Sequence, residues 1–349
     1  MVSRSSKAFD PYMDRPHVLI LGGGASLAAF PNGDKWGRKL PLMNNLVDVV
    51  GLHPILKRAG IGYQGENFES LYSDLAISGK YSDCVQEIEQ AVFDYFAQLQ
   101  LPESPTLYDH LVLSLRKKDV IATFNWDPLL MRAWARNQSR ASSMPAIFFL
   151  HGNTDIGYCM AHKPVTVGNR GMRCTRCWKP YQDSRLLYPV AQKHYSDDPF
   201  ISKSWELLRA CLKDAYVLTI FGYGAPSSDS EAVALMKDAW GTPGQRNLEE
   251  IEIIDIKNEE ELVATWKDFI NSHHYRTANS FYDSWTANQP RRTCEAMWQE
   301  LMEIQFLDNN PIPRSSDWAS LYAWYEPLWE GERQADAKGS CTRPSQNPI

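Results

Sequence analysis

Reactive side chains follow two apolar runs of the sequence. Asn125 and Asp127 come at the end of the run Val120–Phe124, and His151 follows the run Ile147–Leu150. Both runs lack polar alternation, as expected of parallel strands that are covered on both faces. Ligands of open α/β sheets bind outside the carboxyl ends of the strands. We therefore expect an orienting amide and a proton-exchanging imidazole at one binding edge.

Two of the acidic residues allow more than one interpretation. Asp127 either contacts a ligand or caps the helix that is predicted to begin near Pro128, because Asp is a favoured N-cap residue. Asp255 ends the run Ile251–Asp255. It either accepts hydrogen bonds from a ribose diol or is a solvated turn residue. Both interpretations stay open from the sequence alone.

Two glycine-rich turns also follow apolar runs. Gly22-Gly23-Gly24-Ala25-Ser26 comes after His17–Leu21. Such a turn lets a pyrophosphate approach the backbone at a helix N-terminus, although any tight strand–helix turn favours glycine and the full G-x-G-x-x-G is absent. The second turn, Gly222-Tyr-Gly224-Ala-Pro-Ser227, follows Tyr216–Phe221 and could wrap a ribose or phosphate.

Four residues have the spacing of a metal site. Cys159-x-x-His162 is followed, after eleven residues, by Cys174-x-x-Cys177. Two close pairs supply four nitrogen or sulfur ligands for tetrahedral Zn²⁺, and the alternative is chance pairing of cysteines. Because the protein fills all four positions, the metal is expected to be structural and not catalytic.

The order of the apolar runs predicts the fold class. Five strand candidates alternate with helical patterns over 81–99, 107–115, 128–135 and 205–215. This alternation is typical of an α/β fold with a Rossmann-like parallel sheet and helices on both faces. We expect one α/β domain over residues 17–275, with a helical insertion at 31–105 and a small zinc-binding module at 158–185. A C-terminal helical element (276–334, with a helix at 292–306) and a flexible tail (335–349) would follow.

Composition limits the class of protein. The chain has 349 residues, 44% hydrophobic and 22% charged, and a net charge of −6. A net negative chain is not expected to bind nucleic acid directly or anionic membranes, which attract basic faces. No apolar run is long enough to span a bilayer, and the polar start lacks a signal peptide. Seven cysteines, an odd number with three beside a His, favour a reducing, cytoplasmic location.

The motifs, in their order, resemble those of the sirtuin (SIR2) superfamily. Sirtuins carry a Gly-Ala-Gly-x-Ser loop, a Thr-Gln-Asn-x-Asp segment, a His-Gly and a two-pair zinc ribbon. The likeness covers residues 17 to 257 and is closest to the SIR2-like domains of bacterial antiphage systems. By position, Asn125 and His151 match the catalytic Asn and His of the family. The resemblance, with the motifs above, assigns NAD⁺ contacts to Gly22, Gly23, Gly24, Ala25, Ser26, Asp34, Asp127, Gly222, Gly224, Ser227 and Asp255.

Two departures from the deacylase pattern bear on the activity. Ala29-Phe-Pro-Asn-Gly-Asp34 replaces the Gly-Ile-Pro-Asp-Phe-Arg of deacylases, and Leu186-Leu-Tyr-Pro-Val-Ala-Gln192 replaces the Phe-Gly-Glu segment that lines their acyl-lysine groove. Many antiphage SIR2 domains, in contrast, lack zinc. The two replacements favour hydrolysis of NAD⁺ over removal of acyl groups from lysine, whereas the Cys159 to Cys177 module lies nearer to the sirtuins.

The resemblance implies an NAD⁺ hydrolase with NAD⁺ as its substrate. It would release nicotinamide and ADP-ribose and act in antiphage defence by NAD⁺ depletion. We expect a homo-oligomer or a partner subunit, such as an ATPase or a phage-sensing protein. The alternatives are an NAD-dependent protein deacylase and a non-catalytic NAD or ADP-ribose sensor that regulates a partner. A dehydrogenase is disfavoured because the glycine fingerprint is incomplete.

Overall fold

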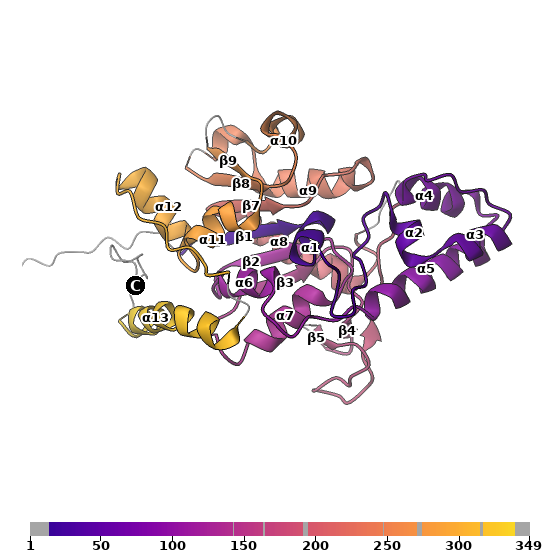
Figure 1. Cartoon of the computed structure of the whole chain (residues 1–349), viewed down its shortest axis with the longest axis horizontal. Helices are drawn as coiled ribbons and strands as arrows, with labels where there is room; N and C mark the ends of the chain where they lie inside the picture. Colours follow the sequence, from indigo (N-terminus) through magenta and orange to yellow (C-terminus); the bar gives the residue numbers. More distant parts are fainter. Residues whose placement is uncertain are drawn as a thin grey trace, which may run out of the picture.

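A parallel six-stranded sheet forms the centre of the computed structural model (Figure 1). The structure describes residues 14–141, 143–162, 165–190, 195–246, 248–270, 274–314 and 317–338. The strand order is β3-β2-β1-β7-β8-β9, and every neighbouring pair is parallel. The strands are β1 (His17–Leu21), β2 (Val120–Thr123), β3 (Ala146–Phe149), β7 (Val217–Phe221), β8 (Glu250–Ile254) and β9 (Tyr275–Ala278).

The strand order places a switch point at the centre of the sheet. From β1 the chain moves outward through β2 and β3, then returns to the other side of β1 for β7, β8 and β9. Leu21 is in register with Thr123 and with Phe221, so the strands end level with one another. The crevice where strand order reverses is the usual ligand site of such sheets.

Helices cover both faces of the sheet, as the sequence predicts. On β1, Val18 and Ile20 belong to one buried cluster and Leu19 and Leu21 to the other, because successive side chains point to opposite faces. The face that carries Val18 and Ile20 packs against α8 (Pro199–Asp214), α9 (Ser230–Trp240) and α10 (Glu259–Trp266). The second face, which carries Leu19 and Leu21, packs against α1 (Gly23–Ala29), α6 (Leu107–Leu113), α7 (Leu129–Asn137) and α13 (Trp318–Ala337).

The residues between α1 and α6 form a group of helices beside the sheet. Figure 1 shows them together on the right, at the opposite end from α12 and α13. Phe96 packs edge-on against Trp126, with ring centroids 5.7 Å apart, and this contact ties the group to the segment after β2. The helices are α2 (Leu46–Val50), α3 (His53–Arg58), α4 (Phe68–Ser78) and α5 (Ser82–Ala97).

A small antiparallel sheet follows β3. Its strands are β4 (Ile156–Cys159), β5 (Thr166–Asn169) and β6 (Gln182–Asp183), in the order β5-β4-β6. We call residues 156–185 the zinc module, of which 163 and 164 lie outside the described residues. The Cys and His residues with metal-ligand spacing belong to this module.

The C-terminal segment closes the second face of the core. Tyr325 and Trp329 of α13 are buried at 0% and 2% exposure, so these aromatic residues complete the core. Arg291 is also buried and pairs with Glu332 of α13 through Nε–Oε1 (2.5 Å) and Nη2–Oε2 (2.7 Å). The remaining elements are η1 (Ser227–Asp229), η2 (Pro243–Gln245), η3 (Phe281–Asp283), α11 (Trp285–Asn288) and α12 (Thr293–Met302).

Three predicted boundaries need correction. The predicted helical segment after 275 begins with a strand, β9. Helix α8 begins six residues before the predicted Trp205, because the Asp198 carboxylate caps the amides of Phe200 (2.9 Å) and Ile201 (3.0 Å). The predicted loose tail starts later than residue 335, because α13 continues to Ala337, and residues 339–349 lie outside the described part. In the described part of the chain, no helix has the length and apolarity to cross a bilayer.

Candidate functional site

A cavity of about 760 Å³ lies at the carboxyl edge of the sheet. Segments that follow all six parallel strands contribute to its lining, together with residues 40–43 of the insertion. A volume of this size is typical of sites that bind a small molecule or cofactor. Ten residues predicted from the sequence line it: Gly22, Gly23, Gly24, Ser26, Asn125, Asp127, His151, Gly222, Gly224 and Asp255.

Two predicted residues lie elsewhere. Ala25 is fully buried in the core and does not line the cavity. The buried carboxylate of Asp34 accepts hydrogen bonds from the amides of Trp36 (2.8 Å), Arg38 (2.9 Å) and Gln100 (3.0 Å). Asp34 is thus used to join a loop to the end of the insertion, which corrects its assignment as a cofactor contact. Ser227, predicted with them, begins the turn η1.

The two glycine turns fit into each other. The amide of Gly24 donates to the carbonyl of Gly222 (2.9 Å), and that of Ala25 donates to Gly22 (3.0 Å). A Cβ on Gly22 would lie 2.5 Å from the Gly222 oxygen, and one on Gly222, which has φ of +59°, would lie 2.3 Å from the Ala25 nitrogen. These glycines are therefore required for the approach of one loop to the other. A bound pyrophosphate would need free backbone N–H groups, and those of Gly24 and Ala25 already donate to carbonyl oxygens of the two turns.

Asn125 is held by its amide nitrogen. Nδ2 donates to the carbonyl of Gly22 (2.9 Å), to Ser26 Oγ (2.9 Å) and to Tyr108 OH (3.3 Å). A backbone carbonyl can only accept, so the atom that faces Gly22 must be the nitrogen. The carbonyl oxygen of Asn125 is then the atom available to a ligand, and it can accept a hydrogen bond from a water or a hydroxyl.

Asp127 both caps a helix and supports Asn125. Its Oδ1 accepts from the amide of Leu129 (3.0 Å), and its Oδ2 accepts from Ser26 Oγ (2.7 Å). Burial raises the pKa of the Asp127 carboxyl, and the hydrogen bond from Ser26 opposes that rise. Burial, with Asp127 nearby, also raises the pKa of Tyr108 well above its ordinary value, so the phenol keeps its proton. The carboxylate of Asp127 is thus used at the start of α7, and the residue also borders the cavity, so its contact with a ligand stays a prediction.

His151 lies against aromatic rings and a carboxylate. Its ring contacts Phe124 edge-on, with centroids 4.8 Å apart, and stacks on Tyr195. Nε2 lies 3.2 Å from the Tyr195 hydroxyl and 3.7 Å from Oδ1 of Asp229. An imidazolium at this position would be stabilised by Asp229, so His151 is placed to accept a proton.

Asp229 was not predicted as a site residue. Its Oδ2 accepts from the Tyr223 hydroxyl (3.0 Å), and Tyr223 stacks on Phe124 with centroids 4.2 Å apart. Burial and the neighbouring Asp229 raise the pKa of Tyr223, which therefore remains a donor. The second glycine turn reaches Asp229, but nothing in the sequence indicates that this carboxylate meets His151. The sequence likewise gives no indication that Tyr108 belongs to the site, since this residue lies on α6, outside the motifs.

Polar groups also line the β8–β9 side of the cavity. Asp255 lines it and at the same time accepts from the amide of Lys257 through Oδ1 (3.1 Å). Asp255 is thus a turn residue whose carboxylate still borders the cavity. Asn279, which follows β9, lies in the same lining.

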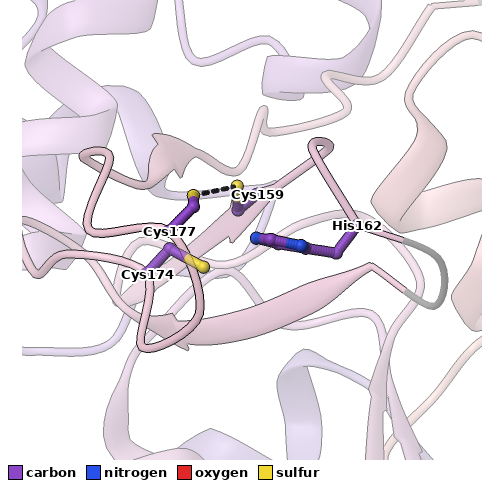
Figure 2. Close-up of side chains that lie close together, drawn as sticks. All are labelled: Cys159, His162, Cys174 and Cys177. Atoms are coloured by element: carbon purple, nitrogen blue, oxygen red, sulfur yellow. Dashed lines mark hydrogen bonds between the residues drawn. The ribbon is translucent and has the colours of Figure 1, made fainter.

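The predicted metal ligands come together in the zinc module. The ligand atoms of Cys159, His162, Cys174 and Cys177 all lie within 4.8 Å of one another. Figure 2 shows the His162 ring pointing toward the three sulfurs. The sulfurs of Cys159 and Cys177 are 3.7 Å apart, and two sulfurs bound to tetrahedral zinc lie about 3.8 Å apart.

The chemistry of these groups also fits a metal. Buried Nε2 of His162 has no hydrogen-bond partner among the described residues, as expected of a nitrogen that is reserved for a metal. Although burial acts against it, hydrogen bonds from Thr166 and from the amide of Arg176 help to lower the pKa of Cys174 to about 6. The thiolate is the metal-binding form of cysteine. The four side chains therefore suit a structural zinc ion.

Solved structures of Sir2 homologues are similar to this chain at low sequence identity. A Sir2 homolog–NAD complex is 11% identical, covers 80% of this chain and 90% of its own, and has a TM-score of 0.36. A Sir2 bound to acetylated peptide is 12% identical, with 83% and 93% covered and a TM-score of 0.36. A Sir2 homologue mutant with ADP-ribose is 11% identical, with 71% and 83% covered and a TM-score of 0.36. No protein-family model and no curated protein matches the sequence.

Proposed function

We propose that this protein binds NAD⁺ in the cavity and hydrolyses its nicotinamide–ribose bond, releasing nicotinamide and ADP-ribose. The observation that carries the proposal is the convergence of Asn125 and His151 on one cavity at the switch point, with Asp229 3.7 Å from the imidazole. The resemblance of the motif order to SIR2-like domains supports NAD⁺ as the ligand.

Several features of the cavity suit a dinucleotide. The lining comes from the ends of all six parallel strands, which gives an elongated ligand contacts along the whole sheet edge. Asp255 and Asn279 offer hydrogen-bond acceptors to a ribose diol on the β8–β9 side. Aromatic residues such as Phe124 and Tyr223 offer apolar surface to a base.

The reaction requires little covalent participation by the protein. The bond from ribose C1′ to nicotinamide breaks with its electron pair going to nicotinamide, which leaves neutral, and a water oxygen bonds to C1′. The Asn125 carbonyl oxygen accepts a hydrogen bond from this water or from a ribose hydroxyl and so orients it. His151 takes the proton that the water loses, and Asp229 stabilises the resulting imidazolium.

Incubation of the purified protein with NAD⁺, followed by chromatography of nicotinamide and ADP-ribose, tests the proposal. We expect Asn125→Ala and His151→Ala each to lower the rate about 100-fold. His53→Ala, which changes an exposed histidine of α3, is the matched control and should retain full activity. An active His151→Ala protein would rule out the assigned base.

Two other outcomes would replace hydrolysis. If acetylated or longer-acylated peptides lose their acyl group only with NAD⁺, and faster than free NAD⁺ is hydrolysed, the protein is a deacylase. In that case the acyl oxygen attacks C1′ in place of water. Tight binding of NAD⁺ or ADP-ribose with no release of nicotinamide would identify a sensor that regulates a partner.

We further propose that the activity serves bacterial antiphage defence through depletion of NAD⁺ in the cytoplasm. The resemblance of the motifs to SIR2-like antiphage domains supports this role. A constantly active hydrolase would deplete a cofactor that its own cell needs, so the activity must depend on a trigger. We infer that self-association, or docking on a partner subunit such as an ATPase or a phage-sensing protein, supplies that trigger.

A further inference from the structure

The zinc module differs in charge from the rest of the chain. Residues 156–185 contain six Lys or Arg and one Asp, in a chain whose net charge is −6. A zinc ion with three thiolates would add a net charge of only −1, and that charge is enclosed by the module. The module is therefore a basic unit on an acidic protein.

The basic side chains reach solvent around one aromatic ring. Arg173, Arg176 and Lys179 are exposed, and Trp178 between them is 73% exposed. Among the described residues, neither Arg176 nor Lys179 forms an ion pair, so their charges are available. Packing does not explain why a tryptophan occupies this position, because most of the surface of its indole faces solvent.

Backbone contacts fix the position of Trp178. Its amide donates to the carbonyl of Cys174 (2.8 Å), and the amide of Cys174 donates to the carbonyl of Lys179 (2.8 Å). The Arg173 guanidinium donates to the Trp178 carbonyl through Nη1 (3.0 Å). Trp178 has φ of +60°, a conformation that is unfavourable for a bulky residue. The ring is thus presented to solvent on a closed loop. The same loop carries two of the metal ligands, Cys174 and Cys177, which Figure 2 shows.

We propose that this surface of the zinc module (Arg173, Arg176, Trp178 and Lys179) binds single-stranded nucleic acid. The Trp178 indole stacks on a base, and the three cations pair with the phosphates on either side. Every nucleotide offers a π-face and a negative charge, so one ring among cations can bind any sequence. The core of a protein–protein interface shares the enrichment in Trp and Arg but is depleted of Lys, whereas Lys179 adjoins this ring.

This inference departs from the expectation based on net charge. A net charge of −6 argues against binding along a whole molecular surface, but a nucleic-acid strand responds to the charge within a Debye length, about 10 Å at 0.1 M salt. The distribution of Lys and Arg is therefore more informative here than their total.

Fluorescence anisotropy of the full-length, zinc-loaded protein tests the proposal. The probes are labelled single strands of DNA and of RNA, about 12 nucleotides long and of one mixed sequence, with the DNA duplex for comparison. We expect both single strands to bind better than the duplex. Trp178→Ala should weaken binding about 5- to 150-fold, the usual loss when one stacked base loses its ring. Trp178→Tyr, which keeps an aromatic face, should restore much of the affinity.

Charge variants separate stacking from simple attraction. Arg176→Ala and Lys179→Ala should each lower the slope of log Kd against log salt by about 0.7, the value for one contact to a single strand. Trp36→Ala and Lys57→Ala change exposed residues of the same types outside the module and should bind as the unchanged protein does. Metal analysis of each variant checks that zinc is retained.

Three results would overturn the inference. The first is no binding of either strand at about 50 mM salt, where phosphate contacts are strong. The second is a Trp178→Ala protein that binds as tightly as the unchanged one. The third is displacement of the strand by polyglutamate at equal charge, which would indicate a surface for an acidic protein.

Discussion

Asn125 and His151 are held in place by different kinds of partner. The Asn125 amide is fixed by the neutral hydrogen bonds that it donates to Ser26, Tyr108 and the Gly22 carbonyl, whereas ring contacts and the carboxylate of Asp229 surround the imidazole. A change of charge near His151 is therefore expected to alter its proton affinity, and a change near Asn125 is expected to alter its orientation.

The first prediction concerns Asp229. Asp229→Asn removes the charge that stabilises the His151 imidazolium and keeps an acceptor for the Tyr223 hydroxyl. We expect kcat for NAD⁺ cleavage to fall about 10- to 100-fold, with a smaller change in KM. Asp238→Asn, on the exposed side of α9, is the matched control. A normal kcat in Asp229→Asn would mean that the carboxylate does not assist the base.

The second prediction concerns pH. Burial lowers the pKa of His17 and of His110 to about 4 each. In the unfolded chain their pKa is about 6.5, so between these values the unfolded state binds protons that the folded state does not. The free energy of unfolding should therefore fall as the pH falls from about 6.5 to 4, by up to about 3 kcal/mol for each histidine.

Urea unfolding at several pH values measures this effect. Burial raises the pKa of Glu252 and of Asp127, so these carboxyls take up protons more readily in the folded state and offset part of the loss. His110→Phe should flatten the dependence on pH, and His53→Ala, which changes an exposed side chain, should leave it unaltered. Constant stability between pH 7 and pH 5 would contradict the prediction.

The sequence predicts the cavity better than it predicts the partners of the catalytic candidates. Glycines and polar residues that follow apolar runs are local signals, and ten of the predicted residues line the cavity. The contact between His151 and Asp229 depends on which strands are neighbours, and that order is not local. Asp34, in contrast, is predicted as a cofactor contact from its place in a motif. The motif does not reveal that backbone amides of its own loop already donate to its carboxylate.

At the scale of elements, the presence of an apolar run decides which strands can be predicted. Five strands fall on the predicted runs, and their observed bounds lie within one residue of these runs. The sixth, β9, has the sequence Tyr-Arg-Thr-Ala and lies half-buried at the edge of the sheet. The other edge strand, β3, is also only partly buried, but its sequence is Ala-Ile-Phe-Phe, so composition and not edge position separates the two. For this reason the sequence predicts only helices for the segment after residue 275 and misses β9.

The third prediction concerns the zinc module. Metal analysis should find about one zinc per chain, and Cys174→Ser should lose the metal and lower the stability of the module, because metal binding is coupled to folding. Cys211→Ser changes a cysteine outside the cluster and should retain the zinc. A metal-free protein of full stability would rule out the site.

At the scale of the whole molecule, the C-terminal segment leaves some apolar residues outside the core. The aromatic residues Tyr325 and Trp329 of α13 are buried, so they cannot form a subunit interface. Ile304 and Phe306, which follow α12, are 76% and 82% exposed. With the less exposed Leu301 and Met302, they are available for contact with a second copy.

The fourth prediction is that NAD⁺ cleavage depends on assembly. Light scattering with size-exclusion chromatography, alongside rate measurements over a dilution series, should show the specific activity falling as the protein dissociates. Phe306→Ser should shift both the dissociation and the fall in specific activity to higher protein concentration, because it removes apolar contact area. A monomer whose turnover does not depend on concentration would contradict this regulation.

The fit of the two glycine turns limits how this chain can change over generations. A side chain at Gly22 would collide with backbone atoms of the facing turn as well as with the Cβ of Tyr223, and one at Gly222 would collide with backbone atoms. Replacing a neighbouring residue by a smaller one therefore creates no space, and no single second substitution can compensate for the first. Variation at these positions requires both turns to be rebuilt together, by exchange of whole segments. A search for suppressors of Gly222→Ala should accordingly return only reversion to glycine.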